Sequence, residues 1–330
     1  MKFLFFTDTH IRGSNPRSRT DNFYDTLINK MNEIVGLATE NQVDYVLHGG
    51  DWFDRPDIAP SIVRDFAMIV KKFEMPVYTV AGNHDIYGHN PCTVPRTMLG
   101  LIEGLDVVNM LSCGGNVILE KDGLTVQLTG ASYNTEIDGE NFKNYYLIKK
   151  HKNADYAINM VHGMLMDKPF YEGIRYTLID DIKDTEADIT LSGHYHTGFG
   201  IIERFSKYFI NPGSIARISA SKTEIKRMPQ VIIIELDKAN IRVFPIILKC
   251  AMKGTEVLDR TELEDTQDRN MNLFNFFNSI NTEKIKFDRV DIQAILTDIA
   301  HSEKIPAQVK TEAIRRIELV RESLQKGDDD

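Results

Sequence analysis

The 330-residue sequence predicts an α/β protein, in which short buried strands alternate with amphipathic helices. Short runs rich in β-branched and aromatic residues recur along the first two thirds of the chain, and each is typical of a buried strand. Between the early runs, apolar residues are spaced three or four positions apart, as in a helix with one buried face. The 42% of hydrophobic residues is enough for a substantial core.

The elements follow in chain order. Strands are predicted at residues 3–6, 45–47, 77–80, 126–128, 156–161 and 189–191. Helical spacing joins Phe23, Leu27, Met31, Ile34 and Val35, and then Ile62, Phe66, Ile69 and Val70. Four further strand-like stretches cover residues 201–205, 208–210, 231–236 and 241–248. We expect these four to pair as antiparallel strands at one side of the sheet system.

The chain divides into three predicted parts. They are a domain over residues 1–250, a polar and acidic linker over residues 251–270, and a helical C-terminal region over residues 271–330. In the last part, apolar stripes at helical spacing lie on both sides of Pro306, within residues 292–299 and 314–324. Such stripes need a surface to cover, and either the chain's own sheet or a partner protein fits this requirement.

Charge and cysteine content limit the functional classes. The net charge of −9 repels a polyanion, so nucleic-acid binding would need a local basic surface or bound metal. The three cysteines form no C-x-x-C pair, which argues against a structural zinc site and a disulfide framework. The apolar residues 1–6 run directly into Asp8 and His10, so neither a signal peptide nor a membrane span is predicted there. We therefore expect a soluble, cytoplasmic protein with no membrane partner.

Potential metal ligands follow the predicted strands, each near a glycine. They are Asp8, His10, Asp51, Asn83, His162, His194 and His196. In an open α/β sheet the carboxyl ends of the strands border one crevice, so ligands from distant segments can meet there. The glycines permit sharp turns and close backbone approach. Any one of these residues alone is typical of a turn, but their repeated placement predicts a polynuclear metal site.

The ligand types indicate which metals are suitable. Imidazole, carboxylate and amide oxygen suit manganese, iron or zinc, and the lack of thiolates argues against a closed structural zinc site. We expect two divalent ions, with Mn²⁺ the first choice and Mg²⁺, Fe²⁺ or Zn²⁺ as alternatives. Two cations roughly 3.5–4 Å apart can clamp a phosphate and lower the pKa of a bridging water. The sequence therefore predicts hydrolysis of phosphoesters at two metals.

Five motifs together resemble the calcineurin-like metallophosphoesterase superfamily. They are Asp8-Thr9-His10, Gly50-Asp51, Gly82-Asn83-His84-Asp85, His162-Gly163 and Gly193-His194-Tyr195-His196. The resemblance covers roughly the first two thirds of the chain. It implies a four-layer β-sandwich flanked by helices, to which the C-terminal region would add a helical appendage.

The same resemblance implies a role for each site residue. One metal would be held by Asp8, His10, Asp51 and His196, and the other by Asp51, Asn83, His162 and His194, so that Asp51 bridges the two. His84 would contact the scissile phosphate and assist the leaving group. Asp85 would orient His84, and a carboxylate that fixes the tautomer of an imidazole serves this purpose.

Three features resemble the SbcD branch of DNA repair nucleases, in a compact form like those of phages. They are the opening strand that runs into Asp8, residues 49–56, and residues 211–217. This resemblance implies a manganese-dependent DNA nuclease with double-strand exonuclease and single-strand endonuclease activity. It also implies a homodimer and an SbcC-type, SMC-like ATPase docked on the C-terminal helices. Some branch members carry histidine where this chain has Asp54, which we expect to orient His84 or another group of the site.

Several cations near the predicted site loops could hold a DNA backbone, although each alone could equally be a solvated charge. They are Arg12, Arg17, Arg19, Arg55, Arg217 and Lys222. Two other functions remain compatible with the sequence. One is a stand-alone phosphodiesterase or phosphatase that acts on nucleotides, phosphoproteins or other small phosphoesters. The other is a catalytically weak scaffold, and the full set of ligands argues against it.

Overall fold

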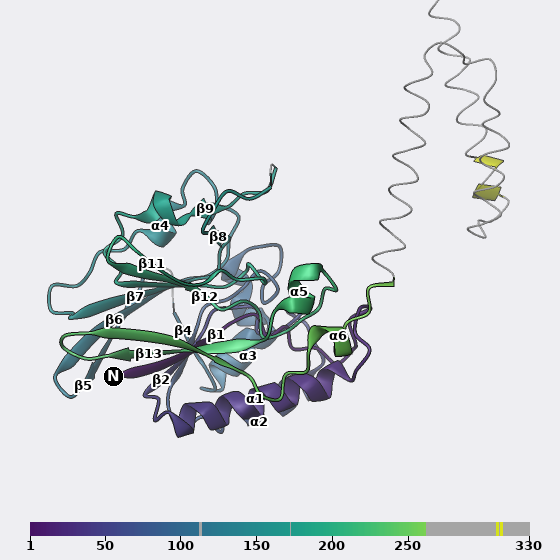
Figure 1. Ribbon diagram of the computed structural model, residues 1–330, viewed down its shortest axis with the longest axis horizontal. Coiled ribbons are helices and arrows are strands. Elements are labelled where there is room, and N and C mark those ends of the chain that lie inside the picture. The colour runs from purple at the N-terminus through teal and green to yellow at the C-terminus, as the bar shows by residue number, and fades with distance from the viewer. Residues whose placement is uncertain (112–113, 172, 262–307, 310, 313–330) are drawn as a thin grey trace, which may run out of the picture. The chain divides into compact units, whose positions relative to one another are not determined.

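The computed structural model describes residues 1–111, 114–171, 173–261, 308–309 and 311–312. It contains two six-stranded sheets (Figure 1). The first has the order β14 (Ile241–Ile247), β13 (Gln230–Leu236), β1 (Lys2–Phe6), β2 (Tyr45–His48), β3 (Val77–Thr79) and β4 (Asn109–Met110). The second has the order β11 (Gly200–Arg204), β12 (Lys207–Asn211), β10 (Ile189–Ser192), β7 (Tyr156–Val161), β6 (Leu124–Ala131) and β5 (Asn116–Lys121). A small sheet pairs β8 (Leu165–Met166) with β9 (Thr177–Leu178).

Helices of different lengths connect the strands. The α-helices are α1 (Phe23–Glu40), α2 (Pro60–Val70), α3 (Met98–Gly104), α4 (Lys143–Tyr146), α5 (Lys222–Lys226) and α6 (Gly254–Val257). Two 3₁₀ helices, η1 (Pro91–Arg96) and η2 (Ile179–Ile182), lie in loops. The predicted helical spacing is confirmed in α1 and α2, whose buried residues are those at intervals of three and four. The Asn22 side chain accepts a hydrogen bond from the Asp25 amide and so begins α1.

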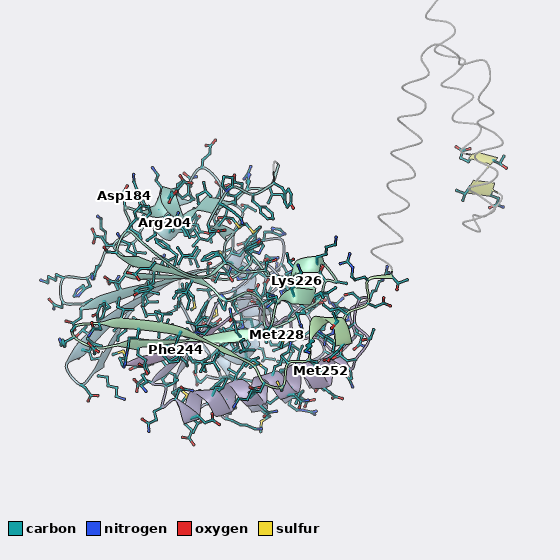
Figure 2. All side chains as sticks on the ribbon, in the orientation of Figure 1. Asp184, Arg204, Lys226, Met228, Phe244 and Met252 are labelled. Atoms are coloured by element: carbon teal, nitrogen blue, oxygen red, sulfur yellow. The ribbon has the colours of Figure 1, made fainter. Side chains whose placement is uncertain are left out.

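The apolar run of β1 is continuous because both faces of the strand are covered. Phe3 and Phe5 belong to the apolar cluster between the two sheets, which also contains residues of β6, β7 and β10. Leu4 and Phe6 point the other way and pack with residues of α1 and α2. Strands buried on both faces in this way read as unbroken hydrophobic runs. Side chains fill the space between the layers (Figure 2).

A third apolar cluster covers the outer face of the second sheet. It joins Val161 of β7 and Phe209 of β12 to Tyr146 of α4 and to Ile179 and Ile182 of η2. The order from one side to the other is therefore helices, sheet, sheet and helices. The predicted four-layer α/β sandwich is confirmed for the described part of the chain.

Two expectations differ from the structure. The four late strands pair antiparallel as expected, β11 with β12 and β13 with β14. The two pairs belong to different sheets, however, because β11 and β12 form the edge of the second sheet and β13 and β14 form the edge of the first. Residues 251–261, the first part of the predicted linker, pack on the compact unit Met1–Leu263. In this stretch Val257 is buried, and its carbonyl accepts a hydrogen bond from the Thr20 amide. The helical region predicted over residues 271–330 lies almost wholly outside the described residues.

Among the described residues, no helix has both the length and the apolar character needed to cross a membrane.

Candidate metal centre

The predicted ligands lie on loops at the carboxyl ends of parallel strands. In the first sheet, β1, β2 and β3 run parallel, and they lead into Asp8 and His10, Asp51, and Asn83, respectively. In the second sheet, the parallel strands β7 and β10 lead into His162 and into residues 194–196. The two sheets present these ends at the same edge of the sandwich. Segments more than 180 residues apart in sequence thus meet at one place.

The first group of potential ligands consists of Asp8, His10, Asp51 and His196. The Nε2 atoms of His10 and His196 are 2.9 Å apart, and His196 Nε2 lies 3.5 Å from Asp8 Oδ1. His10 Nε2 lies 3.6 Å from Asp51 Oδ2. Atoms that bind one ion at about 2.1 Å are separated by roughly 3.0–3.6 Å from one another. The spacing of this group therefore suits a divalent cation at its centre.

The second group shares Asp51 with the first and adds His162 and His194. His162 Nε2 lies 3.3 Å from Asp51 Oδ2 and 3.3 Å from Asn83 Oδ1. Asp51 Oδ2 is buried and has no hydrogen-bond partner, although Oδ1 of the same carboxylate accepts a bond from the His84 amide. A buried oxygen without a partner is costly, and a cation on each side would satisfy it. The donor set therefore fits two divalent ions that share Asp51.

Strained backbone shapes this site. Asp8, His10, Asp51 and His194 all have positive φ, between 42° and 70°. Residues other than glycine rarely adopt this conformation, and such strain is concentrated at functional sites. Gly82 is required for a different reason, because a Cβ at this position would collide with the Asp51 carboxylate. The strain and this close approach together let the side chains converge on a small volume.

Neighbouring groups hold the ligands in place. The Nδ1–H of His162 donates to the Gly49 carbonyl at 2.7 Å, which leaves Nε2 free to face the site. The Asp8 carboxylate accepts bonds from Thr7 Oγ1 and from the His194 amide. Ser214 Oγ donates to the Asp8 carbonyl at 2.8 Å. Sequence reasoning noticed residues 211–217 only as part of a resemblance and did not predict this support.

Burial and mutual charge shift the pKa values of the metal-free site. Burial opposes ionisation of Asp51, but His162 and His10 outweigh it and hold the pKa of Asp51 below its usual value. Burial also lowers the pKa of His162, yet the Asp51 charge raises it to about 9. For His194, burial and then the His162 charge lower the pKa to about 3. Asp51 and His162 thus form a buried ion pair, and a cation entering the site would displace the proton of His162.

His84 is oriented differently from the expectation. Its Nδ1–H donates to the main-chain carbonyl of Asp54 at 2.9 Å, while the carboxylate of Asp85 accepts bonds from the amides of Trp52, Phe53 and Gly82. The prediction that the Asp85 carboxylate binds and orients the His84 ring is therefore wrong. Asp85 instead holds together the two loops that carry the site, residues 52–53 and 82. Burial, and then the Asp51 charge, raise the pKa of Asp85 to about 7.

The side chain of Asp54 faces other groups. Its Oδ2 pairs with Arg12 Nη1 at 3.0 Å, and its Oδ1 lies 3.9 Å from His10 Nδ1. His10 Nδ1 is buried and has no hydrogen-bond partner. Asp54 was expected to orient either His84 or another group of the site. Its carboxylate faces His10, a candidate metal ligand, and it is the main-chain carbonyl of Asp54 that binds the His84 ring.

The predicted DNA contacts fall into two sets. Arg17, Arg55 and Lys222 are exposed, and Arg12 is partly exposed beside Asp54. Arg19 and Arg217 are buried, so we withdraw both as phosphate contacts. Arg19 pairs with Asp21 and donates to the Arg217 carbonyl, and Arg217 donates to the carbonyls of Arg227 and Met252. Their guanidinium groups stabilise the loops behind the site.

Comparison with known proteins places this geometry in a family. The family model of the calcineurin-like phosphoesterases matches residues 1–198, which include all seven predicted ligands. The chain belongs to the calcineurin-like phosphoesterase family. It is accordingly a phosphoesterase, and so a hydrolase, with a candidate two-metal site.

Within this family, the chain is weakly similar to two archaeal proteins named DNA double-strand break repair protein Mre11. The protein of Sulfurisphaera tokodaii is 26% identical over 201 residues, which is 59% of this chain and 49% of that protein. The protein of Thermoplasma acidophilum is 34% identical over 87 residues, 25% of this chain and 22% of that protein. The matched part of the chain thus spans about half or less of these relatives.

One solved structure similar to this calcineurin-like phosphoesterase is a dimetal phosphatase from Danio rerio. It has 11% sequence identity and a TM-score of 0.47, with 75% of this chain and 98% of that chain covered.

Proposed function

We propose that this phosphoesterase is a manganese-dependent DNA nuclease that hydrolyses phosphodiester bonds, with double-strand exonuclease and single-strand endonuclease activity. The observation that carries the proposal is the buried Asp51 Oδ2, which accepts no hydrogen bond and lies 3.6 Å from His10 Nε2 in one group of ligand atoms and 3.3 Å from His162 Nε2 in the other. The similarity to proteins named for double-strand break repair supports DNA as the substrate.

The proposed roles follow from the two ligand groups. Asp8, His10, Asp51 and His196 hold one ion, and Asp51, Asn83, His162 and His194 hold the other. When bound, two divalent ions polarise the phosphoryl group and lower the pKa of water beside it. Because Nδ1 of His84 is bound to the Asp54 carbonyl, Nε2 is the ring nitrogen that can deliver a proton to the departing oxygen.

Partners belong to the same proposal. We propose that the chain acts as a homodimer with an SbcC-type, SMC-like ATPase, in a recombination and repair complex. The C-terminal region over residues 271–330 would dock this ATPase. Deletion of everything after Asn270 is therefore expected to leave metal binding and hydrolysis of small diesters intact while it abolishes capture of the ATPase. Retention of the ATPase by the shortened chain would contradict this part.

A second candidate function is a stand-alone phosphodiesterase or phosphatase for nucleotides and other small phosphoesters. The burial of Arg19 and Arg217 favours it, because it removes two of the cations expected to grip a DNA backbone. Arg12 is also paired with Asp54. A small substrate needs fewer backbone contacts than a DNA strand, whose binding depends strongly on them.

A cleavage panel tests these functions against each other. Purified chain with Mn²⁺ is incubated with double-stranded, single-stranded and hairpin DNA and, separately, with bis-para-nitrophenyl phosphate. We expect DNA to be degraded, EDTA to abolish the activity, and Asp51→Asn to lose both metal and activity. The exposed His151 gives a control variant, His151→Ala, which should behave as the wild type. Cleavage of the small diester with intact DNA, even with the ATPase present, would refute the nuclease and leave the second function.

A further inference from the structure

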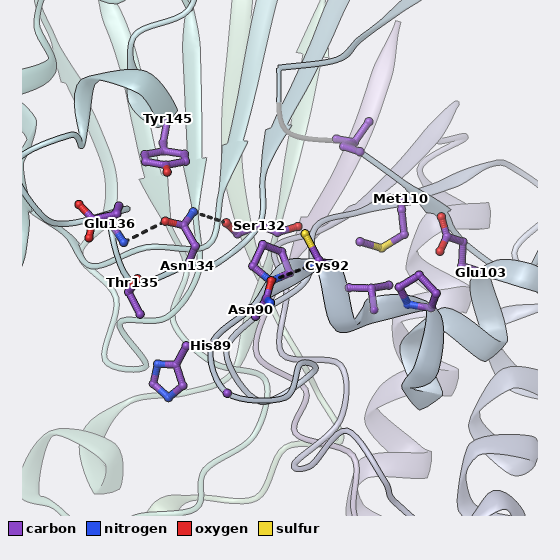
Figure 3. A pocket seen from close by; sticks show the side chains of 15 residues that line it. His89, Asn90, Cys92, Glu103, Met110, Ser132, Asn134, Thr135, Glu136 and Tyr145 are labelled. Atoms are coloured by element: carbon purple, nitrogen blue, oxygen red, sulfur yellow. Dashed lines mark hydrogen bonds between the residues drawn. The ribbon is translucent and has the colours of Figure 1, made fainter.

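A cavity of about 730 Å³ lies beside the metal centre, between the loops of residues 88–95 and 132–136 (Figure 3). These loops continue from the carboxyl ends of β3 and β6, the same edge of the sandwich that carries the metal ligands. Glu103, Met110, Leu111 and Tyr145 complete the wall. None of the metal ligands lines this cavity, so it is a separate compartment next to the site.

Tyr133 connects the two compartments. Its ring centroid lies 5.2 Å from that of His194, on the metal side, and 5.3 Å from that of His89, on the cavity side. The centroids of the His89 and His194 rings are therefore at most 10.5 Å apart. A nucleotide whose phosphate lies at the metal centre can reach across this distance with its sugar and base.

The lining of the cavity excludes a phosphate. None of the fifteen described lining residues is Lys or Arg, and two of them, Glu103 and Glu136, are acidic. A second backbone phosphate would be repelled there. Apolar walls come from residues of the loop 91–95 and of β4. An apolar cavity with a few polar groups suits an uncharged ring system.

The polar groups in this lining are arranged to pair with such a ring. Asn134 accepts a bond from the Glu136 amide at 2.9 Å and donates to the Ser132 carbonyl at 3.3 Å, which holds its side-chain amide in place (Figure 3). One hydrogen of its Nδ2 remains for a ligand. Asn90 Oδ1 accepts from the Cys92 amide, and its Nδ2 donates to none of the residues that the structure describes. His89 is exposed and has φ of 59°, with its ring edge-on to Tyr133.

We propose that this cavity binds the nucleobase of the nucleotide next to the scissile phosphate, with His89 stacking on the base and Asn90 and Asn134 donating to its edge. The proposal rests on the proposed function, because it takes the phosphate at the metal centre to belong to a nucleotide. A base enters the cavity only after it leaves its stack in the duplex, and unpaired nucleotides do so at the lowest cost. The cavity therefore makes the enzyme favour unpaired or frayed nucleotides at the cut.

The test compares substrates with and without a base. They are the para-nitrophenyl esters of thymidine 5′-phosphate and thymidine 3′-phosphate, and bis-para-nitrophenyl phosphate, all with the same leaving group. The measured quantity is the ratio of kcat/KM for a thymidine ester to that for the base-free diester. Base–aromatic stacking is removed in His89→Ala, and Cys92→Trp fills the cavity from its wall. Far-UV circular dichroism checks the fold of each variant, and His151→Ala serves as the control.

We expect His89→Ala to lower this ratio about 5- to 150-fold for at least one thymidine ester. Cys92→Trp should lower it as well, and His151→Ala should leave it unchanged. Saturation-transfer NMR of thymidine with the metal-free protein should show binding that both cavity variants lose. Unchanged ratios, or no thymidine binding to the wild type, would overturn the base site. Failure of the proposed nuclease is distinguished from this, because DNA would then stay intact in the cleavage panel while the wild type still bound thymidine and still preferred a thymidine ester to the base-free diester.

Discussion

Replacement of His84 by alanine separates the chemistry of the site from its metal binding. The His84 amide donates to Asp51 Oδ1 at 2.8 Å, and this bond survives in His84→Ala because it belongs to the main chain. The ring is held by the Asp54 carbonyl rather than by a metal-facing carboxylate. We therefore expect the variant to keep both ions and to lose only the proton that the ring delivers.

The size of the loss depends on the leaving group. A positioned general acid contributes about 10²- to 10⁴-fold to the rate, equivalent to about 3–5.5 kcal/mol of barrier. A deoxyribose alkoxide needs the full contribution, so DNA cleavage by His84→Ala should fall by that factor. Para-nitrophenolate leaves without a proton, so hydrolysis of bis-para-nitrophenyl phosphate should fall much less.

The assay combines initial rates on both substrates with metal content measured by mass spectrometry, and His151→Ala is the matched control. Equal losses on the two substrates would show that His84 does not act on the leaving oxygen. Loss of bound metal would show that the His84 ring is a metal ligand. The structure offers an explanation for that outcome, because the ligand atoms of His84, His10 and Asp54 form a third group that is close enough to hold an ion.

Three further predictions concern the groups around the metals. Asp54→Asn removes the negative charge that lies 3.9 Å from His10 Nδ1. A titration should show that the affinity for Mn²⁺ falls by about tenfold or more. Unchanged metal affinity would mean that Asp54 acts through its main-chain carbonyl alone. The pKa of His162 is raised to about 9 in the metal-free chain, so its ion pair stabilises the fold fully below pH of about 6.5 and this contribution is lost as the pH rises towards 9. Metal uptake near pH 7.5 should then release about one proton from His162, seen by calorimetry in buffers of different ionisation enthalpy; an uptake without proton release would contradict the assignment. Ser214→Ala removes a hydroxyl that lies 2.8 Å from the Asp8 carbonyl and 2.6 Å from the Ala216 carbonyl. The Asp8 carbonyl keeps its bond from the Ala216 amide, so the free energy of unfolding should fall by only about 0.5–1.5 kcal/mol. An unchanged urea midpoint would show that this hydroxyl is dispensable.

Much of the fold could be predicted from local sequence. The strand at residues 156–161 coincides with β7, and the spacing of Phe23, Leu27 and Met31 matches the buried face of α1. Sheet membership could not be predicted, because β12 and β13 are both apolar strands and nothing in their composition says which sheet each joins. The strand β5 was missed because most of its residues are exposed at a sheet edge.

The candidate site was predictable in its members and less so in its connections. All seven ligand positions lie at the predicted edge, because their strands run parallel and end together. Partner choice within the site depends on loop geometry, so the sequence did not show that Asp85 binds amides or that Asp54 holds His84 by its carbonyl. The burial of Arg217 could not be predicted for the same reason, since the local sequence around an arginine does not show whether its side chain is exposed or buried among loops.

The metal ligands come from both sheets, with Asp8 and Asp51 on one and His162 and His194 on the other. The distance between the two sheets is set by side chains such as Phe5 and Leu128, which pack against each other's sheet in the interior. Close-packed interiors transmit small changes of volume. The separation of the two candidate ligand groups is thus controlled from the middle of the sandwich, so a smaller side chain far from any ligand would change which metal fits the site.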